Sequence, residues 1–328
     1  MKALHVTKLA LFALLSTLPV QAAQCPDYGI TDHMPSLLNP NQHKFKKWGN
    51  RWLSSWYTPY HMVHDQIVAA GSSATMVGKF DYDWAMHKDL EGEYVHAYIY
   101  GTHMSSWHYL GRYKTDSDGK VYVPVSAKPE GDYVVRMVVE GDLSSATGYL
   151  TVASQNRPTV LFDIDGTITV DDFEAVNDYL NTDNAENYPY ATNVVNTYIN
   201  RGYQVIFLTG RPYWITKNTR QWSEYSGIKP WHLHTNSNSD NPLNMQTQAY
   251  KTEYIKYLKN KVGLNIIRAY GNAQTDIDAY ADAGIDASQT YIIGDNAGNN
   301  NTQPLHNSYE SHYYDIVLNQ PYVQCTAH

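Results

Sequence analysis

The chain has 328 residues, a net charge of −8 and 13% aromatic residues, among them 29 Tyr and 8 Trp. This length suits about two domains, and the negative charge argues against a nucleic-acid-binding protein. The aromatic content is typical of β-rich structure and of surfaces that contact sugars or membrane interfaces, without deciding between them.

Residues 1–22 have the pattern of a secretory signal peptide. Lys2 and Lys8 flank an apolar run from Leu9 to Val20, which is too short to span a membrane, and residues 20–22 form a small-x-small cleavage site. Cleavage would remove two positive charges and change the net charge from −8 to −10. We therefore expect a secreted or periplasmic protein.

The chain has two cysteines, Cys25 and Cys325, near the two ends of the mature sequence. An exported chain meets an oxidising compartment, so we predict a disulfide between them, with two free thiols as the alternative. Closing so long a loop corresponds to about 5 kcal/mol in the chain-entropy model.

Residues 23–73 form an aromatic and basic segment. Trp48, Trp52 and Trp56 recur every four residues and would share one face of a helix. The basic residues close to them are Lys44, Lys46, Lys47 and Arg51. Such a face could make peripheral contact with an anionic membrane. We favour the alternative, in which the tryptophans pack against the rest of the protein.

Residues 74–153 predict an antiparallel β-sandwich of immunoglobulin-like shape. Six short segments are rich in β-branched and aromatic residues, and Val121, Val123 and Val125 alternate as in a half-buried strand. Asp118-Gly119 between two such segments predicts a β-hairpin. No catalytic group gathers in this region.

Residues 154–328 predict an α/β domain with a doubly wound parallel sheet. Apolar strands at 159–165, 203–210, 266–272 and 290–294 alternate with helical patterns at 191–200, 213–225, 252–263 and 276–284. Alternation of this kind indicates a parallel sheet covered on both faces. In such sheets the chemistry lies at the carboxyl ends of the strands.

Polar residues follow three of these strands. Asp163 and Asp165 end the first strand, two residues apart, and like charges this close repel unless something neutralises them. A metal-dependent catalytic site would explain the pair, whereas the alternative is an ordinary Asp-Gly turn. The other candidates at the strand ends are Gly166 and Thr167, Thr209, Gly210 and Arg211, Asn272 and Asp276, with Lys251 near the start of a helix.

The order of these residues resembles the haloacid dehalogenase superfamily, which carries a DxDGT motif, then a Thr or Ser, a Lys and a final acidic motif. Here "DIDGT" begins at Asp163, Thr209 and Lys251 follow, and "GNAQTD" ends at Asp276. "AYKTEYIKYL" is similar to the catalytic domain of the lipins. "LTGRP" and residues 264–294 are similar to the C-terminal lipin-like domain of membrane-associated phosphatidylinositol transfer proteins. The likeness covers about residues 159–294 and does not extend into the predicted sandwich, except that lipins also carry an immunoglobulin-like piece.

Phosphatases of this superfamily usually insert a cap domain, but residues 165–209 and 211–251 are each about long enough for only one helix–strand unit with loops, so we expect little or no cap. The resemblance implies a role for each site residue. Asp163 would be a nucleophile that forms an aspartyl-phosphate, and Asp165 would be the general acid and base. Mg²⁺ would be held by Asp163, Asp165 through its backbone carbonyl, Asn272 and Asp276. The substrate-binding residues would be Gly166, Thr167, Thr209, Gly210, Arg211 and Lys251, with phosphatidate the favoured phosphomonoester.

Two other functions stay open at this point. The resemblance to transfer proteins allows a non-catalytic module that binds phosphatidate, and the motifs alone allow a small-molecule phosphatase. Arg211 fits a substrate clamp and a structural ion pair about equally well. For His232 and His234, alternation along a strand is favoured over a metal pair. Asp278 is expected to be an exposed helix residue rather than a ligand.

Overall fold

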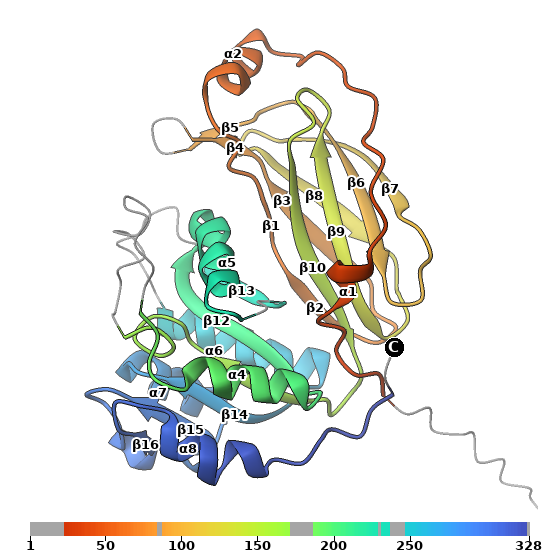
Figure 1. Ribbon diagram of the computed structural model, residues 1–328. Helices are drawn as coiled ribbons and strands as arrows, with labels where there is room; N and C mark the ends of the chain where they lie inside the picture. Colours follow the sequence, from red (N-terminus) through yellow and green to blue (C-terminus); the bar gives the residue numbers. More distant parts are fainter. Residues whose placement is uncertain (1–22, 84–86, 171–185, 229–230, 237–246, 327–328) are drawn as a thin grey trace, which may run out of the picture.

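The computed structural model describes residues 23–83, 87–170, 186–228, 231–236 and 247–326. The predicted signal peptide lies outside these residues, as do parts of both segments considered for a cap. Figure 1 shows a β-sandwich packed against an α/β domain, with the N-terminal segment running along the sandwich. Within the described residues no helix has the length and apolar character needed to cross a membrane.

The sandwich has a three-stranded and a five-stranded sheet. The first has the order β1 (Met62–Val63), β3 (Ala74–Lys79) and β8 (Lys120–Val125). The second has the order β2 (Gln66–Ala69), β10 (Ser145–Ala153), β9 (Gly131–Val139), β6 (Tyr94–Gly101) and β7 (His108–Lys114). β4 (Asp81–Tyr82) and β5 (Lys88–Asp89) pair separately.

The inner faces of the two sheets share one hydrophobic core. Val121, Val123 and Val125 of β8 are buried in it, while Tyr122 between them points outward and is 55% exposed. Met137 of β9 packs in the same core from the opposite sheet. The half-buried strand predicted from the alternating valines is therefore confirmed.

Three features of the sandwich differ from the prediction. Its strands begin at Met62, within the segment 23–73 that was predicted to precede it. β2 runs parallel to β10, so the sandwich is not purely antiparallel; β2 enters at a sheet edge, where a strand of either direction can pair. Asp118-Gly119 does not close a hairpin, because β7 and β8 belong to different sheets. The Gly119 carbonyl accepts the Phe80 N–H at 2.9 Å, which holds this turn beside the β3 sheet.

The α/β domain has a six-stranded parallel sheet. Its order is β13 (Leu233–Asn236), β12 (Gln204–Pro212), β11 (Pro158–Phe162), β14 (Asn265–Gly271), β15 (Thr290–Ile293) and β16 (Gln303–Leu305). All five pairings are parallel. A β-sandwich followed by an α/β domain with a parallel sheet is thus the fold of this chain.

Helices cover both faces of this sheet. One face packs α4 (Ala191–Asn200), α5 (Thr216–Tyr225) and the C-terminal turns after α8 (Glu310–Asp315) around Phe162 and Phe207. The other packs α6 (Thr247–Tyr257) and α7 (Gln274–Asp282) around Leu161 and Ile206. Neighbouring residues of β11 and β12 thus face opposite helical layers, which explains their continuous apolar sequence. Short helical turns lie at Tyr213–Ile215, Leu258–Val262, Ala287–Gln289, Asn299–Asn301 and Val317–Asn319.

The two domains share buried contacts. Ile67 of β2 packs in the same core as Ile255 of α6. Asp65, just before β2, is buried and accepts hydrogen bonds from Arg220 Nη2 at 2.5 Å and from the Leu233 N–H at 2.8 Å. An aspartate of the sandwich therefore holds α5 and β13 of the other domain.

Residues 23–25 and 325–326 meet beside the α/β domain. Cys25 and Cys325 form a disulfide with their Cα atoms 5.0 Å apart, so the predicted pairing is confirmed. The Cys25 N–H donates to the Thr326 carbonyl, and the Thr326 N–H donates to the Ala23 carbonyl. The N-terminal segment continues through α1 (Ile30–His33) and then to α2 (Trp48–Trp56) at the far end of the sandwich (Figure 1).

The favoured position of the tryptophans on α2 was wrong. Trp48 is 83% exposed, Trp56 is 73% exposed and Trp52 is 43% exposed. The face of α2 that packs on the sandwich is supplied by Asn50 and Leu53, which are buried. A helix this short buries one narrow stripe of side chains. In α2 that stripe consists of Asn50 and Leu53, so the tryptophans remain exposed.

Candidate functional site

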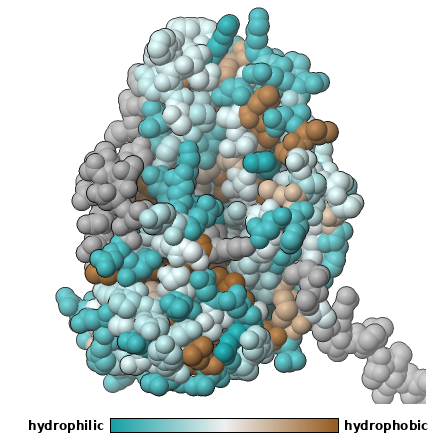
Figure 2. Space-filling view, in the orientation of Figure 1, coloured by the Kyte–Doolittle hydropathy of each residue, from teal (hydrophilic) through white to brown (hydrophobic). Residues whose placement is uncertain are grey.

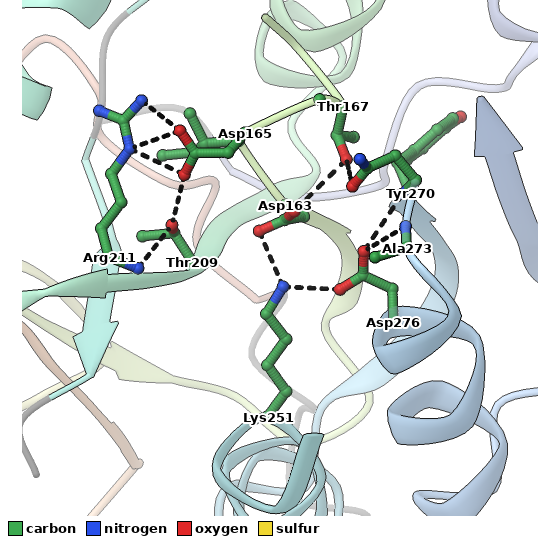
Figure 3. A network of polar contacts seen from close by, with 12 residues as sticks. Asp163, Asp165, Thr167, Thr209, Arg211, Lys251, Tyr270, Ala273 and Asp276 are labelled. Carbon is green, nitrogen blue, oxygen red and sulfur yellow. Dashed lines mark hydrogen bonds and ion pairs between the residues drawn. The ribbon is translucent and has the colours of Figure 1, made fainter. Parts of the chain in front are cut away.

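The predicted site residues lie where the strand order of the α/β sheet reverses. From β11 the chain adds β12 and β13 on one side, then crosses to β14 on the other side of β11. Such a reversal leaves a crevice at the carboxyl ends of the central strands. Figure 3 shows that Asp163, Thr167, Thr209, Arg211, Lys251 and Asp276 gather there.

Asp163 follows β11 directly and is 5% exposed. Its N–H donates to the Tyr270 carbonyl at 3.0 Å, which continues the pairing of β11 with β14. Lys251, from the first turns of α6 and 2% exposed, places Nζ 2.8 Å from Asp163 Oδ1 and 2.6 Å from Asp276 Oδ1. The helix lysine thus bridges two buried carboxylates.

This triad has more negative than positive charge, because two carboxylates face one ammonium. The pKa of Asp163 is raised to about 7, chiefly by burial; Lys251 opposes the shift, and the negative charges of Asp276 and Asp165 add to it. Burial alone would lower the pKa of Lys251, but the two carboxylates raise it above its usual value. Lys251 therefore stays charged, and Asp163 is where a proton or an added cation relieves the excess.

Asp276, which was predicted as a metal ligand, contacts both Lys251 and the loop at Asn272. It lies at the third position of α7, where its Oδ2 accepts the N–H groups of Asn272 and Ala273, both at 3.1 Å. Its Oδ1 accepts from Lys251. Because both oxygens already have protein donors, Asp276 orients Lys251 and the Asn272 loop. Gly271 is needed here, since a Cβ atom on it would lie 2.7 Å from the Asp276 Cβ.

Thr167 joins the first strand to this loop. Its Oγ1 lies 3.4 Å from Asp163 Oδ2 and 3.2 Å from Asn272 Oδ1. The turn that positions it requires a left-handed residue, and Gly166 supplies this with φ +64°. Two oxygen atoms, one from each strand end, therefore flank one hydroxyl beside the Lys251 ion pair.

Asp165 belongs to a second group and points away from the triad (Figure 3). Arg211 Nε donates to both Asp165 oxygens, at 3.0 and 2.9 Å, and Nη2 donates to Oδ1 at 2.6 Å. Thr209 Oγ1 donates to Oδ2 at 3.3 Å. Arg211 is only 7% exposed and also donates to Thr219 Oγ1. In the structure Arg211 is thus an ion-pair partner of Asp165, and Thr209 contacts the same carboxylate.

Gly210 lets α6 approach the end of β12. A Cβ atom at this position would lie 2.9 Å from Thr247 Cγ2. Thr247 opens α6, one helical turn before Lys251. The absence of a side chain at Gly210 therefore allows α6 to approach β12 closely enough to bring Lys251 to Asp163.

The remaining candidates lie elsewhere. His232 and His234 stack with Tyr254, and His232 Nε2 is 2.7 Å from the Tyr254 hydroxyl, as expected for packed histidines near a strand. Asp278 is partly exposed and accepts from Gln274 Nε2 at 2.8 Å. Across the residues that the structure describes, no three His, Cys, Asp or Glu side chains form a cluster that would hold a metal ion.

Three residues that contact the site were not predicted individually from the sequence. Asn296 Nδ2 donates to the Asn272 carbonyl at 2.9 Å, from a polar loop whose position after a predicted strand was a usable signal. The Tyr309 hydroxyl donates to the Thr167 carbonyl at 2.9 Å. Thr219 supports Arg211 from α5. For Tyr309 and Thr219 no local pattern indicates the contact, which depends on the tertiary fold.

The oxygen atoms around Asp163 suit a hard divalent cation. Asp163 Oδ2 and Asn272 Oδ1 converge on the same hydroxyl group, and the triad beside them has excess negative charge. Mg²⁺ binds proteins through one or two carboxylates, carbonyl oxygens and several waters. The Asp163 carboxylate and the Asn272 amide oxygen are donors of that kind.

The two domains match two domains of one group of known proteins. Residues 160–294 match the family model of the LNS2 domain of PITM 1-3, and residues 59–152 match its β-sandwich domain. The expectation that the likeness stops before the sandwich is therefore wrong. The residues 48–56 that form α2 precede both matches.

Named relatives agree with these matches. Membrane-associated phosphatidylinositol transfer protein 1 of Homo sapiens is 30% identical over 280 residues, which cover 84% of this chain and 21% of that protein. Membrane-associated phosphatidylinositol transfer protein 3 of Homo sapiens is 29% identical over 72% of this chain and 24% of its own length. Protein retinal degeneration B of Drosophila melanogaster is 27% identical over 71% of this chain and 18% of its own length. The chain thus spans about a fifth of the length of these relatives.

Proposed function

From the homology of both domains to the sandwich and LNS2 domains of membrane-associated phosphatidylinositol transfer proteins, we propose that this chain acts on a phospholipid phosphomonoester. The favoured substrate is phosphatidate, and the reaction is hydrolysis at the carboxyl edge of the α/β sheet. We further propose that the α/β domain has the doubly wound fold of the haloacid dehalogenase superfamily and is of the lipin type. The observation that carries the proposal is the buried Asp163, held by Lys251 at 2.8 Å at the sheet's switch point.

The first step is attack of an Asp163 carboxylate oxygen on phosphorus. A bond forms between Asp163 and phosphorus, the bond to the lipid oxygen breaks, and an aspartyl-phosphate results. Lys251, held between Asp163 and Asp276, neutralises charge that collects on the phosphoryl oxygens. Mg²⁺, when bound by Asp163, the Asp165 carbonyl and Asn272, would supply further stabilisation of that charge.

The second carboxylate completes the proton balance. Asp165 gives a proton to the departing lipid oxygen and later takes one from the water that hydrolyses the aspartyl-phosphate. For this role Asp165 has to leave the three N–H contacts from Arg211 and turn toward the substrate. Arg211 would then be free to bind the phosphate group, so the ion pair and the catalytic arrangement exclude each other.

The same ion pair favours a second function, a non-catalytic phosphatidate-binding module. If Asp165 stays on Arg211 and Thr209, no acid or base remains beside the phosphate. Asp163 and Lys251 would then bind a phosphomonoester without cleaving it. The retained Asp163 and Lys251 contact is compatible with both functions, so activity has to be measured.

We also propose that the protein acts after export, in a secreted or periplasmic location. The signal-peptide pattern of residues 1–22 supports this, together with the disulfide between Cys25 and Cys325. A phospholipid in an exposed membrane leaflet would be within reach of such a protein.

The deciding experiment is phosphate release with and without Mg²⁺ from phosphatidate vesicles, a soluble aryl phosphate and small sugar phosphates. We expect Mg²⁺-dependent release from phosphatidate and none from Asp163→Asn. When the aryl phosphate carries a labelled phosphoryl group, the Asp165→Asn protein should accumulate labelled aspartyl-phosphate at Asp163, because loss of the general base typically slows hydrolysis 10²–10⁴-fold. Tight phosphatidate binding without any release would decide for the binding module, and release from sugar phosphates alone would decide for a small-molecule phosphatase.

The metal is tested without any turnover by thermal unfolding. A cation that binds only the folded state raises the unfolding temperature. We expect Mg²⁺ to stabilise the wild-type protein and to have less effect on Asp163→Asn, which lacks a ligand charge. Equal shifts in both proteins would remove Asp163 as a ligand.

A further inference from the structure

Helix α2 presents three indole rings to solvent. Trp48, Trp52 and Trp56 are spaced four residues apart, so they share one face, and their exposed fractions are 83%, 43% and 73%. Indole is seldom left this exposed without a role, because its large apolar surface gains from leaving water. Figure 2 shows the residues of high hydropathy in separate groups on the visible face.

The exposure follows from how α2 is held, since its other side is fastened to the sandwich. Leu53 is buried in the sandwich core, and Asn50 Nδ2 donates to Glu93 Oε1 at 2.8 Å and to the Glu91 carbonyl at 3.0 Å. The Lys47 N–H at the start of the helix donates to Glu93 Oε1 at 2.9 Å. The tryptophan face is therefore presented by an anchored helix at the end of the sandwich (Figure 1).

The sequence segment that contains α2 has a net charge of opposite sign to that of the whole chain. Residues 33–64 contain four Lys and Arg and no Asp or Glu, although the net charge of the protein is −8. These residues, all exposed, are Lys44, Lys46, Lys47 and Arg51. Two carboxylates contact this segment: Glu91 is paired with both Lys47 and Lys88 at 3.1 Å, and Glu93 is buried beneath the helix, where it accepts the Lys46 and Lys47 N–H groups.

We propose that α2 and the basic residues beside it form a peripheral docking surface for an anionic phospholipid membrane. Indole rings prefer the headgroup region of a bilayer, and clustered lysines and arginines are attracted to an anionic leaflet. An exposed helix with both features lies in the plane of the interface. This surface lies before the two matched family domains, the first of which begins at residue 59.

The occupant follows from the combination of features. A sugar ligand would use the indoles but would not need four cations. A second copy of this chain would bring four more cations to the same surface and repel it. A flat anionic surface satisfies the three indoles and the basic residues together.

The test is vesicle flotation with phosphatidylcholine alone and with added phosphatidylglycerol, which is anionic but has no phosphomonoester to occupy the proposed active site. We expect binding to the anionic vesicles only, lost at least tenfold in Trp48→Ala/Trp56→Ala. Lys44→Gln/Arg51→Gln should weaken binding about fivefold for each charge removed. The matched control is Tyr225→Ala, which removes a ring that is 74% exposed in the other domain and should change nothing.

Fluorescence separates insertion from simple adhesion. Bromine-labelled lipid should quench tryptophan emission of the wild-type protein, and the quenching should disappear when the α2 tryptophans are replaced by Phe, while flotation persists. Unfolding curves of Trp48→Ala/Trp56→Ala should match the wild type, since both rings are exposed. Asp163→Asn should still float, so failure of the catalytic proposal leaves this one standing.

Two results would overturn the proposal. One is unchanged flotation of Trp48→Ala/Trp56→Ala on anionic vesicles. The other is absence of vesicle binding together with a dimer, seen by analytical ultracentrifugation, that the same substitutions dissociate, because the face would then pair two copies of this chain.

Discussion

At the scale of single residues, the site is a balance between two ion-pair groups. Asp163 shares Lys251 with Asp276, whereas Asp165 forms an ion pair with Arg211. Two carboxylates that are two residues apart in sequence are thereby kept in different surroundings. This separation is what an attacking group and a proton-transferring group require.

A buried histidine supports the strand behind Asp163. His312 Nε2 is 2.8 Å from the Tyr270 hydroxyl, and the Tyr270 carbonyl accepts the Asp163 N–H. Burial lowers the pKa of His312 to about 4, and Arg268 adds to the effect. His312 is therefore neutral in the folded protein, while the same residue in the unfolded chain binds a proton below about pH 6.5.

We predict that His312→Gln makes stability less dependent on pH. Because the folded pKa is depressed, the stabilising contribution is present above pH 6.5 and is lost as the pH falls toward 4. The wild-type protein should lose roughly 3 kcal/mol more than the variant across this range. Urea unfolding at several pH values measures the difference, with His306→Gln as the exposed control. Parallel pH curves for wild type and His312→Gln would contradict the assignment.

At the scale of elements, the approach of α6 to β12 positions the lysine. Gly210 at the end of β12 faces Thr247 at the start of α6, and Lys251 follows one turn later. Gly210 and Thr247 are both small residues. Their small combined volume sets how closely the helix can lie against the strand end.

We predict that Gly210→Ala is destabilising and that Thr247→Ala rescues it. The new Cβ would lie 2.9 Å from Thr247 Cγ2, and overpacking of this kind typically costs about 1–3 kcal/mol. Removing the Thr247 side-chain atoms leaves only its Cβ, at 3.8 Å. A double-mutant cycle of unfolding free energies measures the coupling. Additive effects of the two substitutions would show that this contact does not limit the approach of α6.

At the scale of the whole molecule, two features join the parts of the chain. Asp65 of the sandwich holds Arg220 and the Leu233 N–H of the α/β domain, and the disulfide joins residues 300 apart in sequence. The disulfide brings the N-terminal segment to the end of the last domain. Together they make the sandwich and the α/β domain parts of one packed unit.

We predict that Cys25→Ser/Cys325→Ser lowers the free energy of unfolding by about 2–5 kcal/mol. The cross-link restricts the unfolded chain, and its loss removes that restriction. Urea unfolding of the wild type in reducing agent should give the same lowered value, while reducing agent should leave the variant unchanged. Equal stability of oxidised wild type and variant would mean that the paired ends contribute nothing to folding.

The sequence alone determined the local elements of the α/β domain and the set of candidate site residues. Helices at 191–200 and 213–225 and the strands that carry Asp163, Thr209 and Asn272 are found close to where their patterns predict them. Each of these patterns depends on neighbours in sequence, such as a continuous apolar run that ends in a polar residue. The disulfide could also be predicted from the sequence, because only two cysteines exist.

Only the tertiary structure decided which of these residues touch. Arg211 forms an ion pair with Asp165. Asp276 accepts hydrogen bonds through one oxygen from Lys251 and through the other from the Asn272 loop. The same holds for β8, which joins the sheet opposite β7 despite the Asp-Gly turn between them. Local patterns set the direction of a side chain relative to its own strand or helix. Which partner it meets depends on the packing of segments far apart in sequence, and so does the choice that buried Leu53 and left Trp48 and Trp56 in solvent.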